Sequence, residues 1–343
     1  MSVLITGGSG FVGINITERL LDEHLDVVNY ATFPVPEEAK DSLAGRPGSY
    51  TYVEGDVLDS VLLDSVIKQY KINTIIHAAV ITPDEEREKL YSRNILNVNY
   101  MGTVEVLEAA RRNGIEKFIY LSSVSVYGDT AFEEDCLLES GSIPCPRTFY
   151  EISKFAAERT ALRYKELFGL PVIAVRLGQI FGPWEHYTGI RHTQSGPFQA
   201  LRHAALNQEA ILPRPGLRDW VYSRDIANTI KEIIGKTDLQ YDLYNIGSGH
   251  SWTVEQWCQL LEKEFPHFNY QITENPNLAN VDFFVPQDAH PLAIERLQTD
   301  VGYYPKYGIE EAFQDYINWV KNTSIFWTNP NKRNQAKENH LSL

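Results

Sequence analysis

The sequence predicts an α/β fold, a doubly wound parallel sheet with a smaller, discontinuous C-terminal substrate lobe. The first half of the chain alternates short apolar runs with longer amphipathic segments, which is the pattern of strands alternating with helices. The central runs are apolar throughout, as expected for strands covered on both faces. After about Gly178 the pattern becomes irregular, and glycine, proline and aromatic residues crowd Phe181 to Pro215.

The predicted strands and helices follow one another along the chain. The strands are Val3–Thr6, Asp26–Tyr30, Tyr50–Val53, Thr74–His77, Phe118–Leu121 and Val172–Arg176. The helices between them include Phe11–Glu23, Leu58–Tyr70, Ile95–Asn113 and Tyr150–Phe168. We expect two later runs, Trp220–Tyr222 and Leu243–Ile246, to return to the sheet. The sheet domain would then comprise residues 1–177 and about 219–247, the second lobe about 178–218 and 248–325, and a polar tail 329–343.

Composition narrows the class of protein. A formal net charge of −14 disfavours binding to nucleic acid, which depends on neutralising phosphates, and favours solubility. The three cysteines form no C-x-x-C pair, so a reducing cytoplasm is the expected location. No apolar run approaches the roughly 20 residues of a membrane span. His186 and His192 lack a metal-ligand spacing, so no metal site is expected.

A glycine-rich turn, Thr6-Gly-Gly-Ser-Gly-Phe-Val-Gly13, joins the first strand to the first helix. Glycine lets backbone N–H groups approach a pyrophosphate, and the partial positive charge of the helix N-terminus favours the anion. A glycine triplet alone can be a simple turn, but its place between a strand and an amphipathic helix favours a dinucleotide site. The predicted cofactor contacts of this turn are Gly7, Gly10, Phe11, Val12 and Gly13.

The second strand lacks the carboxylate that commonly holds the ribose of a dinucleotide. Asp26 begins this strand and therefore lies at its wrong end. The residues toward the other end are neutral, namely Asn29, Tyr30 and Thr32. No arginine follows immediately to bind a 2′-phosphate, although Lys40 and Arg46 are not far along the chain. The sequence leaves the choice between NAD and NADP open.

A tyrosine and a lysine, Tyr150 and Lys154, share one helix face at i and i+4, and Ser122 and Ser123 follow the fifth strand. Removing a hydride from an alcohol requires a base for the hydroxyl proton. Lowering a tyrosine pKa from ~10 to about 7 takes roughly 4 kcal/mol, and one cation at about 4 Å is worth on the order of that amount, so Lys154 and an oxidised nicotinamide ring together could supply it. The chain presents the glycine-rich turn, then the serine after the fifth strand, then the Tyr–Lys pair, and this order predicts hydride transfer. The pair alone is weaker evidence, since about one such pair is expected by chance among 19 tyrosines.

With these motifs the chain resembles the extended short-chain dehydrogenase/reductases of the NAD-dependent epimerase/dehydratase family, over about residues 2–322. Their fold is the Rossmann fold. The further matching segments occur in family order: Glu54–Val57, His77–Ala79, Asn99–Thr103, Arg176–Pro183, Arg218–Tyr222 and Tyr244–Ser248.

The resemblance implies a role for each matching residue. Ser123, Tyr150 and Lys154 would be catalytic. The cofactor site would add Asp56 and Val57 at the adenine, Ala78 and Ala79 in the trough, and Asn99 and Ser122 nearby. Arg218 would grip a nucleotide-sugar phosphate, and Gln179 stands where many members have a substrate-binding asparagine. Many members are homodimers through the helices near Ile95–Asn113 and Tyr150–Phe168.

Three departures from the family bear on the substrate. The region Asn277–Phe284 lacks an arginine that often gives a second phosphate grip. Dehydratases of the family carry an Asp-Glu pair where Val124 and Ser125 stand, so water loss is not expected. Arg191 could pair with a substrate carboxylate or phosphate, or form ordinary salt bridges in a surface loop.

The leading hypothesis is a nucleotide-sugar epimerase that removes a hydride transiently and returns it, with NAD as cofactor and NADP not excluded. The close alternative is a net dehydrogenase or reductase of a free sugar or sugar acid, motivated by Arg191 and by the missing arginine. A non-catalytic dinucleotide sensor is a third possibility, against which the intact Ser–Tyr–Lys set argues. His77, at the end of a buried strand, is expected to be structural.

Overall fold

The computed structural model describes residues 1–186, 191, 193–285 and 287–323, and its main feature is a seven-stranded parallel sheet. The strand order is β10-β6-β5-β4-β1-β2-β3. The strands are β1 (Ser2–Thr6), β2 (Asp26–Ala31), β3 (Ser49–Glu54), β4 (Thr74–His77), β5 (Lys117–Ser123), β6 (Val172–Leu177) and β10 (Leu243–Ile246). Since β1 lies inside the sheet and the chain extends it to both sides, the predicted doubly wound α/β fold is confirmed.

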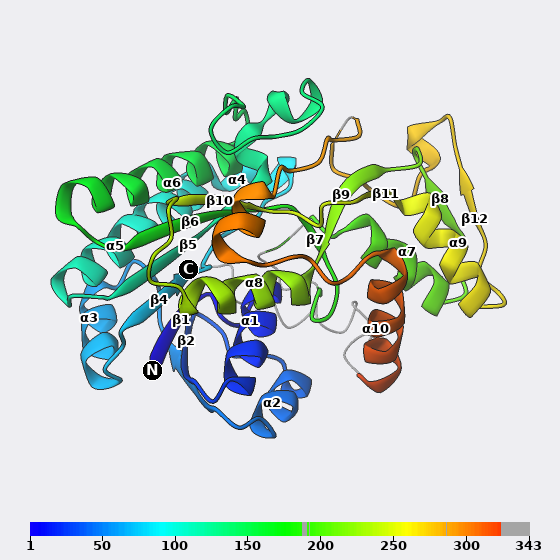
Figure 1. Ribbon diagram of the computed structural model, residues 1–343. Helices are drawn as coiled ribbons and strands as arrows, with labels where there is room; N and C mark the ends of the chain where they lie inside the picture. Colours follow the sequence, from blue (N-terminus) through cyan, green and yellow to red (C-terminus); the bar gives the residue numbers. More distant parts are fainter. Residues whose placement is uncertain (187–190, 192, 286, 324–343) are drawn as a thin grey trace.

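Helices cover both faces of this sheet (Figure 1). One face carries α1 (Phe11–Asp22), α2 (Glu37–Ala44) and α8 (Ser223–Gly235), and the other α3 (Ser60–Gln69), α5 (Gly102–Arg112) and α6 (Phe149–Phe168). In β1, Val3 and Ile5 belong to the first apolar core and Leu4 to the second. Successive side chains of a strand point to opposite faces, so a strand covered on both sides must be apolar throughout.

The second lobe lies to one side of the main sheet and contains two small sheets (Figure 1). One sheet consists of β7 (Gln179–Phe181), β9 (Leu217–Tyr222) and β11 (Ser251–Thr253), and the other of β8 (Ala210–Leu212) and β12 (Tyr270–Ile272). The helices are α7 (Gly196–Ala205), α9 (Val254–Glu264) and α10 (Ile309–Asn322). The lobe's core is aromatic, with Phe181 packed edge-on against Trp252 and Trp257 at ring-centroid distances of 5.2 and 5.4 Å.

Two predictions about the elements need correction. Leu243–Ile246 returns to the main sheet beside β6 as expected, but Trp220–Tyr222 does not. It forms part of β9, which pairs with β7 and β11 because Trp220 and Tyr222 bury their rings in the lobe's aromatic core. The single helix expected over Ile95–Asn113 is instead the end of α4 (Glu85–Leu96), a π-helical turn at Asn97–Met101, and α5.

The predicted division into domains stays a prediction, and the polar tail at 329–343 falls outside the described residues. No helix in the described part of the chain is both long and apolar enough to cross a membrane.

Candidate active site

A cavity of about 1480 Å³ runs along the carboxyl ends of the strands and is closed on its other side by the second lobe. Polar side chains at this edge of a parallel sheet are where chemistry is expected. The structure brings the following predicted residues together on its walls: Gly7, Gly10, Phe11, Val12, Gly13, Asp56, Val57, Ala78, Ala79, Ser122, Ser123, Tyr150, Lys154, Gln179, Arg191 and Arg218. Asn99 does not line the cavity.

The glycine turn forms a cradle that side chains would fill. Gly7 has φ +68°, and a Cβ atom there would lie 2.6 Å from the Ala79 Cα. A Cβ on Gly13 would lie 2.6 Å from the Gly8 Cα. Helix α1 begins at Phe11, so its unpaired N–H groups and partial positive charge face the same space. These residues fit the pyrophosphate of a dinucleotide, which needs close backbone approach without side chains.

The catalytic candidates occupy the end of β5 and the first turn of α6. The hydroxyl of Ser125 donates to the Ser123 Oγ at 2.9 Å, and Ser123 hydrogen-bonds with the half-buried Tyr150. A capping box of Thr148 and Glu151 starts α6 and thereby orients the tyrosine. Burial raises the pKa of the Tyr150 phenol, while the hydrogen bond with Ser123 and the charge of Arg191 lower it. The protein alone therefore holds this phenol protonated at neutral pH.

Lys154 lines the same cavity and is anchored to the sheet. Its Nζ donates to the Leu121 carbonyl and lies 4.5 Å from the centroid of the Tyr120 ring. Burial lowers the pKa of this amine to about 7, against the opposing charge of Glu158. The expected direct pairing of this ammonium with the tyrosine is not among its contacts, and Arg191 is the cation that lowers the Tyr150 pKa.

A buried ion pair lies directly behind these groups. Arg176 on β6 binds Glu158 on α6 through two hydrogen bonds, of 2.6 and 2.9 Å, and Ser122 donates to the same carboxylate at 2.6 Å. The glutamate side chain is 0% exposed and the arginine 3%. Sequence reasoning missed Glu158, although its place four residues after Lys154 put it on the same helix face.

A second buried network holds the wall of the cavity. The His77 Nδ1 lies 2.7 Å from the Thr6 Oγ1, and its Nε2 lies 2.9 Å from the Thr103 Oγ1. Burial, with a contribution from the charge of Lys154, lowers the His77 pKa to about 3. Asn99 accepts from the Ile81 N–H and donates to the Ile81 carbonyl, at 2.8 and 2.9 Å. His77 is thus hydrogen-bonded through both ring nitrogens, as suits the structural role expected of it. Asn99 holds the backbone of Ile81, which lines the cavity.

The lobe side of the cavity presents a buried cation. Arg218 is 3% exposed and donates through one guanidinium nitrogen to the Phe283 carbonyl at 3.2 Å. Its Nε has no hydrogen-bond partner within the described structure, and no carboxylate of the described residues lies within salt-bridge distance. Burial lowers its pKa to about 10, so it is still charged at neutral pH. An anion in the cavity would supply the missing partner.

Arg191 is engaged by the protein itself. It forms an ion pair of 3.1 Å with Glu185, whose side chain is 0% exposed, and its Nε donates to the Thr193 carbonyl. Its guanidinium lies 5.1 Å from the ring centroid of Phe11 in the glycine turn. Arg191 thus has an ion pair within the protein, while its side chain, 26% exposed, also lines the cavity.

The sequence predicts no metal site at His186 and His192. His186 contacts the Trp184 carbonyl through its Nδ1 at 2.6 Å, and His192 lies outside the described residues. Within the described ranges no cluster of three or more metal-ligating side chains occurs.

Comparison with known proteins places these features in a family. The family model described as the NAD dependent epimerase/dehydratase family matches residues 3–247. A mouse dTDP-D-glucose 4,6-dehydratase is 25% identical over 96% of this chain and 91% of its own length. The low-salt glycan biosynthesis protein Agl12 of Haloferax volcanii is 30% identical over 73% of this chain and 77% of its own length.

Solved structures are similar over nearly the whole chain. A Thermotoga maritima UDP-glucose 4-epimerase with UDP-glucose has a TM-score of 0.78 at 20% identity, covering 94% of this chain and 99% of the other. A Bacillus anthracis dTDP-glucose 4,6-dehydratase in complex with NAD has a TM-score of 0.77 at 24% identity, covering 95% and 98%. At this level of identity the likeness concerns the fold.

Proposed function

The chain belongs to the NAD dependent epimerase/dehydratase family, and from that membership we propose that it is a nucleotide-sugar epimerase. The observation that carries the proposal is the unpartnered Nε of the charged Arg218, which lines the same cavity as Tyr150 and Ser123. A buried guanidinium without a counter-ion is stable only where an anion completes it. The phosphates of a nucleotide sugar supply such an anion, whereas a neutral free sugar does not.

The catalytic chemistry is assigned to three residues. A bound nicotinamide dinucleotide, held by the glycine turn and by Asp56 and Val57, would supply the hydride acceptor and donor. As a phenolate, which would form only beside the positive charge of a bound oxidised nicotinamide, Tyr150 takes the proton of the sugar hydroxyl and later returns it. Ser123 holds that hydroxyl by a hydrogen bond, and Lys154 places a titratable cation beneath the site. Its lowered pKa, about 7, makes this charge sensitive to pH near neutrality.

Elimination of water is a poorer match to the residues present, although several relatives are dehydratases. Loss of water needs an acid and a base beside the reacting carbon in addition to Tyr150. Val124 and Ser125 occupy the positions after Ser123, and the Ser125 hydroxyl hydrogen-bonds with the Ser123 Oγ and with Tyr150. Neither side chain is a carboxylic acid. Net oxidation of a sugar acid is also disfavoured, because Arg191 is already neutralised by Glu185.

We also propose that the enzyme is a cytoplasmic homodimer. Apolar side chains stand exposed on neighbouring helices, Leu90 and Tyr91 on α4 and Phe149 and Ile152 on α6. A second copy packed on these helices would cover them. The cysteines Cys136, Cys145 and Cys258 are all free thiols, as is usual in a reducing compartment.

The proposal is tested by supplying UDP-glucose and dTDP-glucose in separate reactions with NAD. Products are followed by chromatography and reduced cofactor by absorbance at 340 nm. We expect an epimer of one nucleotide sugar without accumulation of reduced cofactor. A 4-keto-6-deoxy product would instead indicate dehydration, and steady growth of the 340 nm signal would indicate net oxidation.

A further inference from the structure

A buried carboxylate lies next to the residues assigned to the chemistry but has no part in that assignment. Glu158 on α6 is 0% exposed and follows Lys154 by one helical turn. It is not among the residues that line the cavity, whereas Lys154 is. Since Glu158 does not reach the cavity, it can act on the reaction only through a neighbouring side chain.

The amine of Lys154 and the carboxylate of Glu158 are bound to adjacent residues of β5. The Lys154 Nζ donates to the Leu121 carbonyl, and the Ser122 hydroxyl donates to Glu158 at 2.6 Å. Side chains four residues apart on a helix also share one face. Lys154 is 5% exposed and Glu158 is 0% exposed. The two charges are therefore neighbours in a region from which water is largely excluded.

The titratable groups around the Lys154 amine come from four elements. They are His77 on β4, Tyr120 on β5, Arg176 on β6, and Tyr150 and Glu158 on α6. Burial lowers the pKa of His77 to about 3, so its ring is neutral at pH 7. Burial raises the pKa of both tyrosines, so they are neutral as well. Of these groups, Glu158 is therefore the one that supplies a negative charge to the lysine.

Two opposing effects set the charge of Lys154. Burial lowers the pKa of the amine to about 7, and the charge of Glu158 acts against this decrease. Arg176 binds the same carboxylate through hydrogen bonds of 2.6 and 2.9 Å, so the three charges form one buried cluster. Without the carboxylate the cluster would hold two cations, and the lysine is the one that can release its proton.

We propose that Glu158 is a positioning residue of the reaction, whose buried carboxylate keeps the Lys154 amine protonated in the cavity that Tyr150 and Ser123 line. A protonated Lys154 adds positive charge to the cavity, and positive charge favours the phenolate form of Tyr150. That form is the one that takes the proton of the sugar hydroxyl, so this step rests on the proposed function. The effect of Glu158 on the charge of Lys154 does not depend on which sugar is bound.

The test follows the charge of Lys154 by carbon NMR of the lysine side chains, in the full chain without sugar or cofactor. The resonance missing from Lys154→Met identifies the residue. In Glu158→Gln the midpoint of its titration should fall by about one pH unit, because a neighbouring opposite charge is lost. In Arg176→Gln the midpoint should rise, because the carboxylate then faces the lysine without its other cation. A role of Glu158 in packing alone would not move the two midpoints in opposite directions.

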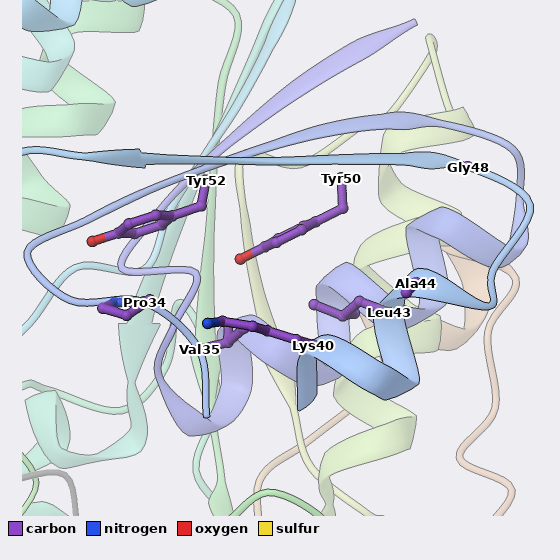
Figure 2. A pocket seen from close by; sticks show the side chains of 8 residues that line it. All are labelled: Pro34, Val35, Lys40, Leu43, Ala44, Gly48, Tyr50 and Tyr52. Atoms are coloured by element: carbon purple, nitrogen blue, oxygen red, sulfur yellow. The ribbon is translucent and has the colours of Figure 1, made fainter. Parts of the chain in front are cut away.

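An exposed lysine–glutamate pair on α2 serves as the control. Lys40 lines a second cavity, of about 500 Å³, and Figure 2 shows its side chain among the residues around this cavity. It pairs with Glu37 at 2.5 Å, but the two side chains are 45% and 83% exposed, so water screens their charges. Glu37→Gln also removes a carboxylate from beside a lysine, and it should leave the Lys154 midpoint unchanged.

Turnover of the nucleotide sugar at two pH values connects this charge to the reaction. Glu158→Gln should lower the turnover about tenfold at pH 8, where a lower midpoint removes most of the remaining protonated Lys154. At pH 5.5 the lysine is protonated in both chains, so the loss should be less than about threefold. A purely structural defect would lower the turnover equally at both pH values, and this result would overturn the proposal.

The NMR titration can overturn the proposal by itself. Either an unchanged Lys154 midpoint in Glu158→Gln or a midpoint that falls in Arg176→Gln would do so. Each variant decides by the sign of its own shift, so the test stands even where one of them fails to fold. If both midpoints move as expected but the unaltered chain converts no nucleotide sugar, the proposed function fails while the control of the lysine charge stands, so the two failures are distinguishable.

Discussion

Two arginines, Arg176 on the sheet side of the cavity and Arg218 on the lobe side, are equally buried but differ in their partners. Arg176 is 2% exposed and Arg218 is 3% exposed. The first binds Glu158 through two hydrogen bonds, whereas the second has a single backbone carbonyl. Burial lowers the pKa of each guanidinium, but the hydrogen bond and charge of Glu158 raise that of Arg176 well above its usual range. The pKa of Arg218 falls to about 10.

The charge of Arg176 is neutralised by the protein, whereas in the proposed function the charge of Arg218 would be neutralised by a ligand. Removing one partner of a buried ion pair leaves an isolated charge and costs stability. A buried charge without a counter-ion already costs stability, and in the proposed function a bound phosphate would offset this cost. We therefore expect a change at Arg176 to lower the free energy of unfolding, and a change at Arg218 to weaken binding of the ligand.

The largest effect is expected at Tyr150, where neither stability nor nucleotide binding should change. Tyr150→Phe removes the proton acceptor and should lower turnover of the nucleotide sugar by about 1000-fold, within the range of general acid–base catalysis. Steady-state rates of nucleotide-sugar turnover measure this loss. The matched control is Tyr164→Phe on the same helix. The Tyr164 hydroxyl donates to Glu108 at 2.7 Å and does not line the cavity. Equal losses in both variants would refute the assignment.

The sheet side is tested at the carboxylate of the ion pair. Glu158→Gln should lower the free energy of unfolding by about 3 kcal/mol, because it leaves the Arg176 charge buried without a counter-ion. Urea unfolding measures the change. Glu166→Gln on the same helix removes a pair whose side chains are 56% and 60% exposed, and it should cost less than about 0.5 kcal/mol. Similar losses would mean that burial does not separate the two pairs.

The lobe side is tested by the pair of variants Arg176→Gln and Arg218→Gln. Arg218→Gln should weaken UDP binding about 30-fold, or ~2 kcal/mol, since it removes a charge-assisted hydrogen bond. The free energy of unfolding should stay the same or rise. Arg176→Gln should show the reverse, a loss of stability with little direct effect on UDP. An equal decrease in the free energy of unfolding in both variants would contradict the predicted difference between the two arginines.

The smallest effect concerns pH and His77. The folded pKa, about 3, lies below the unfolded value, so the unfolded chain binds more protons and stability falls as pH drops below about 6.5. Between pH 7 and pH 5.5 this one group should cost about 1 kcal/mol. The free energies of unfolding of the unaltered chain and of His77→Asn at both pH values give the difference. A difference independent of pH would show that the His77 pKa is the same in the folded and unfolded chains, which contradicts the lowered pKa.

The sequence predicted most of the first half of the fold and most of the residues that the structure brings to the cavity. Val3–Thr6 and Thr74–His77 were recognisable as strands because a strand covered on both faces is continuously apolar. The glycine turn was recognisable because only glycine fits the backbone approach seen at Gly7. Both features depend on residues that are neighbours in the sequence, so the local sequence pattern is enough to predict them.

The tertiary structure decided the rest. Apolar periodicity reports that Trp220–Tyr222 is buried but not in which sheet, since both sheets bury such a strand. Whether Arg176 or Arg218 is neutralised depends on a carboxylate brought in from another element, Glu158, which no spacing in the sequence specifies. The hydrogen bond from Tyr30 on β2 to the Asp56 carbonyl, just after the neighbouring strand β3, likewise depends on the pairing of the two strands. Charge and ligand preference thus arise from which side chains the folded chain brings together, whereas strand and turn formation depends on neighbours in sequence.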